Sequence, residues 1–488
     1  MNEETKNLVC LLLTDQDPDV RRRAAEDLAK CRGDRNVLAI LSVALEDENK
    51  GVEDAVSRSF LRIGGVAAAR AIVHHLEDEN IASRNLAAKL LVRLGEDSVQ
   101  ALVPYLRTDN KDVRKLAIDI LGEIKSREPI YYLLPLLHDT DPNVIVAAIE
   151  ALGNIGGTAA IGPISDTYEH YPYARIVAIE ALGKIGGSSV REFLEDKFKE
   201  ALAVENADGV YLFALLDALG VVGDGETLAV LLAHYENFKE HLRDVLLHEM
   251  VQIIERCNLE FQFHEPSKDD LLHALRSDND QIILSAAKGL VQFKGRDVTS
   301  ALLLSLGVSE ELDFVVIAQM SARPKVFQIT VGCLQGEVQR GKIQMIMLLG
   351  KLATEFIHAY RSLDTYPLLD SELDHTFAVV TEAWQDSSQE DREIIADTLF
   401  RLDCDRAVDF LYNALIELDP WSRVHIIDQL GTMPTRRALD CIARFVDDEN
   451  EMVQESARSA LRAAGFPFEI DQPIKKNELL DNGVNRRV

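Results

Sequence analysis

Apolar and small residues recur at helical spacing over most of the chain, and the stretch Leu137–Gly157 shows this most clearly. Asp141 and Pro142 suit the start of a helix, because an Asp side chain accepts hydrogen bonds from first-turn amides and Pro lacks the N–H that would stay unpaired there. Gly156 and Gly157 suit its end, because Gly adopts a left-handed cap at little cost. The stretch therefore predicts one amphipathic helix. The positions predicted to share its apolar face are Val144, Ala147, Ala148, Ala151, Leu152 and Ile155.

The same string returns thirty residues later, where AIEALGKIGG occupies Ala178–Gly187. A second apolar segment follows each Gly-rich turn, and no part of the chain alternates with period two for long enough to need a sheet. A helix of about 12 residues cannot bury its apolar face alone, so neighbouring helix pairs must stack and share a core. We therefore predict an all-α solenoid of about fourteen two-helix repeats. Positions equivalent to Val144 stand 30 to 32 residues apart at Val20, Val52, Ser83, Val113, Val144 and Ala174, and 31 apart at Asp391, Ser422 and Val453.

The clarity of the repeat pattern divides the chain into segments. The pattern is clear towards both ends and looser in the middle, and it is interrupted where Pro, aromatic and acidic residues break the helical spacing. The last segment has little periodicity, which is typical of an extended end. The predicted segments are an N-terminal repeat array over 1–200, divergent middle repeats over 201–355 with a loop near 257–269, an irregular insertion over 356–390, C-terminal repeats over 391–465, and an extended tail over 466–488.

The charge of the chain limits its partners. With 81 acidic and 52 basic residues, the formal net charge is −29. Phosphate binding rests on Lys and Arg, so we expect neither nucleic acid nor an anionic membrane surface as a partner. The acidic balance favours a protein partner with a basic surface.

Targeting and redox signals point to the cytoplasm. The start MNEETKNLVCLLL has acidic residues where a signal peptide needs basic ones, and no stretch approaches the roughly 18 apolar residues of a membrane span. The six cysteines include no CxxC pair, so neither a disulfide framework nor a zinc site is expected. We expect a cytoplasmic protein.

The repeat unit resembles a known family. Units of about 31 residues reading D-P-x-V-x-x-x-A-x-x-A-L-G-x-I-G are similar to short HEAT-like repeats of the phycobilisome-lyase (PBS lyase) type, most closely over 20–187 and 391–465. The resemblance implies a right-handed α-α superhelix in which first helices form the convex face and second helices the concave face. It implies no single function, because HEAT-like arrays serve as scaffolds, as chaperone-like subunits of bilin lyases, as DNA-lesion binders and as an iron hydroxylase.

Several residues are of types that bind metal ions. The iron-hydroxylase resemblance would need four His-Glu dipeptides on equivalent helices, and this chain has only His248-Glu249 and His264-Glu265, at a spacing that does not match the repeat. His74-His75 and the acidic motifs Asp15–Asp19 and Asp139–Asp141 lack the arrangement of a calcium loop, and helix capping explains the acidic motifs. We therefore expect no metal, no cofactor and no catalytic residue.

One region concentrates amphipathic aromatic and histidine side chains, which are enriched at protein interfaces. If the family geometry holds, most of them lie on second helices or the following turns, towards the concave face. The alternative is that these rings fill space between repeats. The predicted partner-binding residues are Tyr131, Tyr132, His138, Tyr168, His170, Tyr171 and Tyr173.

These observations favour a non-enzymatic scaffold or adaptor that binds a protein partner on the concave face of an acidic solenoid. The first alternative is a bilin-lyase-like or chaperone-like subunit acting on a tetrapyrrole-bearing protein, which the repeat subtype suggests. The second, less favoured, is a dinuclear-iron hydroxylase of the HEAT-like type.

Overall fold

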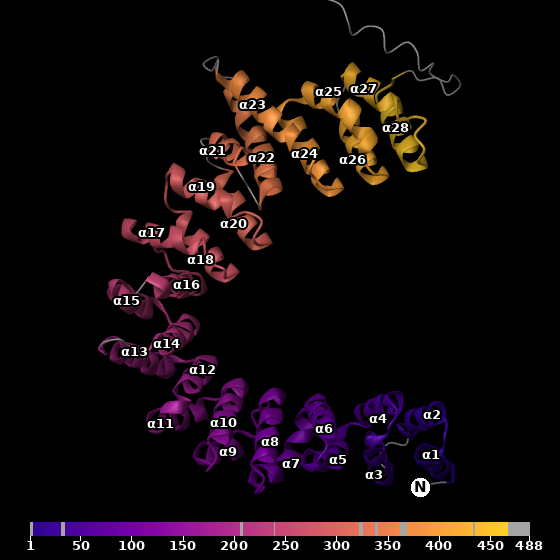
Figure 1. The fold of residues 1–488 in the computed structure, drawn as a ribbon, viewed down its shortest axis with the longest axis vertical. Coiled ribbons are helices and arrows are strands. Elements are labelled where there is room, and N and C mark those ends of the chain that lie inside the picture. The colour runs from indigo at the N-terminus through magenta and orange to yellow at the C-terminus, as the bar shows by residue number, and fades with distance from the viewer. Residues whose placement is uncertain are drawn as a thin grey trace, which may run out of the picture. The chain divides into compact units, whose positions relative to one another are not determined.

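The chain folds into consecutive pairs of α-helices, and its described residues contain no strand (Figure 1). They group into two compact units, Met1–Phe261 (unit 1) and Gln262–Val488 (unit 2). The finer division into five segments stays a prediction, and all of the predicted tail beyond 466 lies outside the described residues. The computed structural model describes residues 3–30, 35–204, 208–238, 240–321, 326–336, 340–361, 368–432 and 435–466.

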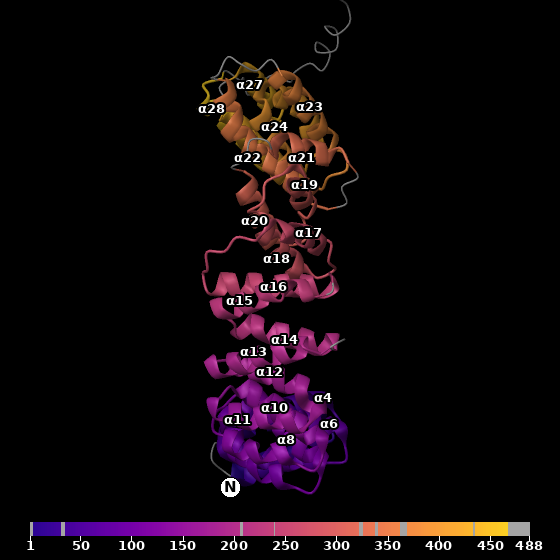
Figure 2. The same cartoon turned by 90° about the vertical axis from the view of Figure 1, so that its left-hand side faces the viewer.

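Unit 1 holds two layers of helices, seen from a second side in Figure 2. Each anchor position of the sequence pattern falls in or directly before a helix of the first layer. The helices of the first layer are α2 (Pro18–Leu28), α4 (Lys50–Ile63), α6 (Ile81–Leu94), α8 (Lys111–Ile124), α10 (Pro142–Ile155), α12 (Arg175–Ile185), α14 (Gly209–Val222) and α16 (Glu240–Arg256). The helices of the second layer are α3 (Arg35–Val43), α5 (Gly65–Ile72), α7 (Val99–Leu102), α9 (Ile130–Leu133), α11 (Ile161–His170), α13 (Ser188–Leu202) and α15 (Gly225–Ala233), and α1 (Glu3–Thr14) precedes them.

Unit 2 repeats the same pairing. Counting both units, the described residues form fourteen first helices, so the prediction of an all-α array of about fourteen two-helix repeats is confirmed. The first helices of unit 2 are α18 (Asp280–Leu290), α20 (Glu310–Met320), α22 (Lys342–Arg361), α24 (Gln389–Leu402), α26 (Pro420–Gly431) and α28 (Glu451–Ala463). The second helices are α17 (Glu265–Ala274), α19 (Arg296–Leu304), α21 (Val326–Leu334), α23 (Leu368–Glu382), α25 (Cys404–Ala414) and α27 (Arg436–Ala443).

The two stretches expected to be irregular contain more helix than the sequence pattern indicates. Within 257–269 the chain leaves the helix after Arg256 and re-enters one at Glu265. Within 356–390, α22 runs on to Arg361 and α23 fills Leu368–Glu382, while 362–367 lies outside the described residues. The repeat pattern is defined by residues of the first helices, and α23 is a second helix. The pattern therefore gives no signal for it.

The caps of the consensus helix are confirmed. The Asp141 carboxylate accepts a hydrogen bond from the Asn143 amide at 2.9 Å, and Pro142 is the first residue of α10. Gly156 ends the helix with a φ of 71°, in the left-handed region that costs a residue with a Cβ most. These residues therefore define where each repeat begins and ends.

The Gly of the A-L-G string allows first helices to pack at backbone contact. A Cβ added to Gly153 would lie 2.7 Å from both the Cα and the Cβ of Ala181 on α12, and one added to Gly122 would lie 2.9 Å from the Cα of Ala151 on α10. Real Cβ atoms do not approach that closely, so Gly is required at these positions in the present packing. The Gly of this string thus allows the first helices of successive repeats to pack closely.

The close approach of first helices bears on the curvature of unit 1. In Figure 1 the row from α2 to α16 turns, and the first helices lie on the inner side of the turn. The prediction of first helices on the convex face and second helices on the concave face is therefore wrong for unit 1. The reason is physical: Gly and Ala bring first helices together, whereas large side chains such as Phe198 and Tyr168 hold the second layer apart.

A repeated arginine links one repeat to the next. Arg21, which follows the anchor Val20, donates from Nε and Nη2 to the two carboxylate oxygens of Asp47 at 2.8 and 2.9 Å. Arg114 makes the equivalent ion pair with Asp139 at 2.9 Å, and Arg423 pairs with Asp448. Burial acts to raise the pKa of Asp47, but the hydrogen bonds from Arg21 and from the Asn49 amide, together with the charge of Arg21, lower it overall.

None of the described helices is both long enough and apolar enough to span a membrane.

Candidate functional site

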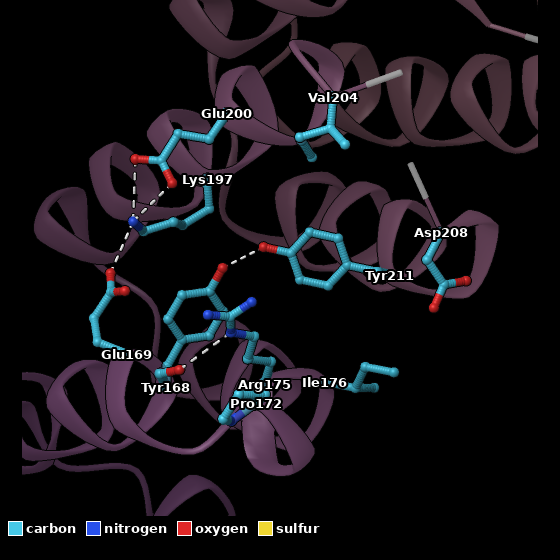
Figure 3. Close-up of a pocket in the computed structure, with 11 residues that line it drawn as sticks. Tyr168, Glu169, Pro172, Arg175, Ile176, Lys197, Glu200, Val204, Asp208 and Tyr211 are labelled. Atoms are coloured by element: carbon cyan, nitrogen blue, oxygen red, sulfur yellow. Dashed lines mark hydrogen bonds and ion pairs between the residues drawn. The ribbon is translucent and has the colours of Figure 1, made fainter. Parts of the chain in front are cut away.

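A pocket opens in unit 1 where α11, α12, α13 and α14 meet (Figure 3). Its volume is about 390 Å³, which lies within the size range of small-ligand sites. The residues that line it are Tyr168, Glu169, Pro172, Arg175, Ile176, Lys197, Glu200, Ala201, Val204, Asp208 and Tyr211.

Two tyrosine hydroxyls meet inside this pocket. The side chain of Tyr168 is buried, with 3% of its surface exposed, and its hydroxyl hydrogen-bonds the hydroxyl of Tyr211 from α14. Burial, followed by that hydrogen bond, raises the pKa of Tyr168 above its usual value, so the phenol stays protonated. Two hydroxyls carry two hydrogens and their mutual bond uses one, so one O–H remains to donate elsewhere.

Lys197 is neutralised within the pocket. Its ammonium lies 2.8 Å from Glu169 and 2.9 Å from Glu200. Partial burial acts to lower the pKa of Lys197, but the hydrogen bonds with both carboxylates raise it overall. The ammonium also lies 5.7 Å from the ring centre of Tyr168, a cation–π contact.

Arg175 is the cation of the pocket that has no carboxylate partner. Its guanidinium carbon lies 5.3 Å from the ring centre of Tyr168, and its Nε donates to the Tyr168 carbonyl oxygen at 3.4 Å. Across the described residues, neither Nη atom of Arg175 makes a hydrogen bond or an ion pair. This arginine follows the anchor Ala174, as Arg21 follows Val20, so it belongs to the same arginine series. In that series Arg21, Arg114 and Arg423 pair with Asp. Arg84 donates to backbone carbonyls instead, and Arg392 stacks on the Trp384 ring as Arg175 does on Tyr168.

A second surface lies on the first helices of the same unit. Glu150 on α10, Glu180 on α12 and Asp217 on α14 each stand three residues before the Gly that packs against the next helix. All three side chains are exposed, and none has an ion pair within the described part of the chain. Equivalent positions on adjacent helices lie roughly 10 Å apart, so these carboxylates form a row, which we call the acidic row.

Helix α14 adds apolar side chains beside this row. Val210, Phe213 and Val221 expose 63%, 47% and 57% of their surfaces, on the face that carries Asp217. Exposed large apolar residues gathered on one helix face mark interaction sites more often than scattered ones do.

Next to the row stands Glu249 on α16, a buried carboxyl group with 6% of its surface exposed. It occupies the position that Ala holds opposite the packing Gly in earlier repeats, and its side chain lies directly over Gly220. Burial, followed by the negative charge of Asp217, raises the pKa of Glu249 from 4.5 to about 8. The group is therefore mostly neutral at pH 7.

The tyrosines and histidines predicted as a partner surface do lie on second helices and the turns that follow them. The rings of Tyr171 and Tyr173 are 5.6 Å apart. Tyr168 instead turns into the pocket, and Tyr131 makes no ring contact with the others in the described part of the chain. The exposed members are Tyr131, Tyr132, His138, His170 and Tyr173.

Sequence reasoning missed Tyr211, Arg175 and Lys197, which share the pocket with Tyr168. Tyr211 stands 43 residues after Tyr168, in the next repeat. The sequence could have singled out Arg175, because Arg recurs directly after anchor positions.

Of the tandem histidines, His75 is held in a structural network. Its Nδ1 lies 2.7 Å from Asp78, and its Nε2 lies 2.9 Å from the Ser42 hydroxyl. Both ring nitrogens are thus engaged. Glu46 completes the one group of three metal-type ligand atoms that converge among the described residues, with its carboxylate 3.8 Å from Nδ1. Hydrogen bonding explains this group without an ion.

The His248-Glu249 dipeptide belongs to no convergent ligand group among the described side chains. Glu249 is buried between α14 and α16, and His264 precedes α17. The side chain of Glu265 lies outside the described residues. No described geometry supports the dinuclear-iron alternative.

Comparison with known proteins identifies the repeats. A family model described as HEAT repeats matches residues 5–93, 99–183 and 133–201. The chain contains HEAT repeats. This confirms the resemblance to HEAT-like repeats, a group that includes the PBS lyase type. The handling of a tetrapyrrole rests on that resemblance alone and stays a prediction.

Solved structures similar to this HEAT-repeat chain are distant. They include an engineered protein (18% identity, 82% of this chain and 99% of that chain covered, TM-score 0.26). They also include yeast importin-β, Kap95p (13%, 95% and 74%, TM-score 0.41). A third is a homology model of the full-length AP-3 complex (11%, 95% and 94%, TM-score 0.40). No curated protein matches the chain.

Proposed function

We propose that this HEAT-repeat chain is a non-enzymatic scaffold that binds a basic segment of a protein partner along the first helices of unit 1. The observation that supports this most is the acidic row of Glu150, Glu180 and Asp217, which are exposed and make no ion pair among the described residues, beside the apolar face of α14. Unpaired surface charges of one sign attract a complementary partner and set its register more than they add affinity.

The spacing of the row suggests the conformation of the bound segment. Adjacent first helices lie roughly 10 Å apart. A polyproline II segment advances about 3.1 Å per residue with three residues per turn, so every third side chain faces the same way. A segment running across the helices would therefore meet one carboxylate at every third residue. Apolar side chains between its basic residues would contact Val210 and Phe213 on α14.

The proposal predicts binding of a fluorescent twelve-residue peptide with Lys at every third position and Leu between them. Reversing two charges of the row, in the variant Glu150→Lys/Glu180→Lys, is expected to weaken binding roughly tenfold or more, since each lost ion pair contributes about 0.2–1 kcal/mol and each new repulsion a similar amount. Fluorescence anisotropy at two salt concentrations measures this, and affinity should fall as salt rises.

The matched control reverses two exposed carboxylates of the second layer, in Glu77→Lys/Glu192→Lys. The net charge changes equally, so a similar loss of affinity in both variants would show non-specific attraction and contradict the proposal. Equal binding of a peptide with its lysines grouped at one end would contradict the proposed register.

The exposed Tyr131, Tyr132 and Tyr173 are proposed as a second contact surface. Tyrosine packs with its ring and hydrogen-bonds with its hydroxyl, which suits an interface. Protection of these three side chains from iodination when the basic peptide is bound would extend the binding site to the second layer.

A further inference from the structure

The pocket of Figure 3 contains Arg175, a member of the arginine series that has no carboxylate partner, although Glu169, Glu200 and Asp208 also line the pocket. Arg21, Arg114 and Arg423 each hold an Asp carboxylate from the start of the next repeat. Arg175 occupies the same place in its repeat, yet its Nη atoms have no partner among the described residues. Arg175 therefore supplies the cation of this ion pair, and none of the described residues supplies the anion.

The sequence explains the missing carboxylate. The pairing Asp stands two residues before the N-cap of the next first helix: Asp47 before Asn49, and Asp139 before Asp141. The N-cap of α14 is Asp208, so the corresponding position is 206, where the chain has Asn. An amide carries no charge, and position 206 lies outside the described residues.

Nearby groups complete a set of donors for an anion. Arg175 presents a planar fork, the geometry that binds carboxylates through two hydrogen bonds. The paired hydroxyls of Tyr168 and Tyr211 have one hydrogen to donate. Lys197 pairs with Glu169 and Glu200. The third carboxylate of the lining, Asp208, accepts from the Val210 amide as the cap of α14. Arg175 is therefore the cation of the lining that has no carboxylate partner.

Apolar side chains line the pocket beside these donors. Ile176 and Pro172 contribute one part of the wall, and Val204, with 61% of its surface exposed, contributes another. A volume of about 390 Å³ accommodates one or two amino-acid residues. An apolar group next to a carboxylate therefore fits the lining.

We propose that the pocket binds the carboxylate of an apolar acid, either the C-terminal residue of a peptide or a free small acid. The carboxylate takes the place on Arg175 that Asp47 and Asp139 take on Arg21 and Arg114, and it accepts the free hydroxyl hydrogen of the tyrosine pair. This site is separate from the acidic row and does not depend on the function proposed for it.

The test uses the full chain and four probes: N-acetyl-leucine, N-acetyl-leucinamide, a tripeptide ending in leucine with a free C-terminus, and inorganic phosphate. Saturation-transfer NMR and competition titrations measure binding. We expect both free carboxylates to bind, the amide to bind at least tenfold more weakly, and phosphate to compete poorly. A tripeptide that binds at least tenfold more tightly than N-acetyl-leucine would identify a peptide end, and the reverse would identify a small acid.

Two arginines of the same series provide matched variants. Arg175→Gln is expected to weaken N-acetyl-leucine binding at least tenfold with little change in the melting temperature. Arg114→Gln is expected to lower the melting temperature, because it breaks the pair with Asp139, and to leave binding unchanged.

Tyr211→Phe removes one hydroxyl of the pair but leaves the Tyr168 hydroxyl free to donate, so it should change binding less than about threefold. The proposal is overturned if the amide binds wild-type protein as tightly as the acid, a comparison that needs no variant to fold. It is also overturned if a folded Arg175→Gln protein binds the acid normally, or if phosphate binds as well as the carboxylates.

Discussion

Replacing Glu249 by Gln is expected to remove a pH-dependent loss of stability from unit 1. The carboxyl group has a pKa of about 8 in the folded chain, against 4.5 for the ordinary group. Between these values the folded state holds a proton that the unfolded state releases, so the free energy of unfolding falls as pH rises. The contribution of Glu249 is complete below pH 4.5 and is lost as pH rises through about 8.

The slope is about 1.4 kcal/mol per pH unit. The Gln side chain has nearly the same shape and does not ionise, so Glu249→Gln should match wild type near pH 5. It should then gain on wild type by about 3–5 kcal/mol by pH 8, and the difference should level off above that pH. Urea unfolding followed by far-UV circular dichroism between pH 5 and 9 measures this.

Unit 2 supplies an internal reference, because both tryptophans of the chain, Trp384 and Trp421, lie there. Tryptophan fluorescence should show no difference between wild type and Glu249→Gln. Asp217→Asn removes the negative charge that helps to raise the pKa of Glu249, so it should move the midpoint of the effect to lower pH. Parallel stability curves for wild type and Glu249→Gln would contradict the assignment.

Replacing Gly153 by Ala is expected to destabilise unit 1, although Ala is the better helix former. The new methyl group would lie 2.7 Å from the backbone Cα of Ala181, and backbone cannot rotate away as a flexible side chain can. Overpacking of this kind costs about 1–3 kcal/mol or more, which exceeds the gain of up to about 1 kcal/mol from helix propensity. Urea unfolding followed by circular dichroism measures the loss.

Gly332→Ala is the matched control, because Gly332 lies on α21 with nothing within 4 Å of an added Cβ. At Gly332 only the higher helix propensity of Ala acts, so the variant should raise the free energy of unfolding of unit 2 by about 0.5–1 kcal/mol. Urea unfolding followed by tryptophan fluorescence measures this. A Gly153→Ala protein that is as stable as wild type would show that α10 and α12 separate at little cost.

The first helices could be predicted from the sequence because their signals are local. Asp141 and Pro142 start a helix, Gly156 ends one, and the spacing between them repeats. The sequence indicated where second helices such as α7 and α9 lie but not their form, because they are short and continue as 3-10 turns that begin at Val103 and Leu134, each with Pro as its second residue. Their form depends on what packs against them.

The candidate site could be predicted only in part. Tyr168 belonged to the expected aromatic cluster, but its partner Tyr211 comes from the next repeat, and pairing across 43 residues has no local signal. The face of unit 1 that each layer occupies followed from the family resemblance and was wrong. That face depends on helix separations, which Gly153 and Ala181 set through contacts in three dimensions.

The packing glycines also determine how unit 1 can deform. First helices from α8 to α12 already approach to backbone contact at Gly122 and Gly153, so that layer resists compression. The pocket at Tyr168 leaves unfilled space beside the second helices α11 and α13, so unit 1 should deform more easily there when it bends. A ligand bound in this pocket would fix the separation of α11 and α13 and with it the curvature of unit 1. The curvature in turn sets the spacing of the acidic-row carboxylates on the first helices.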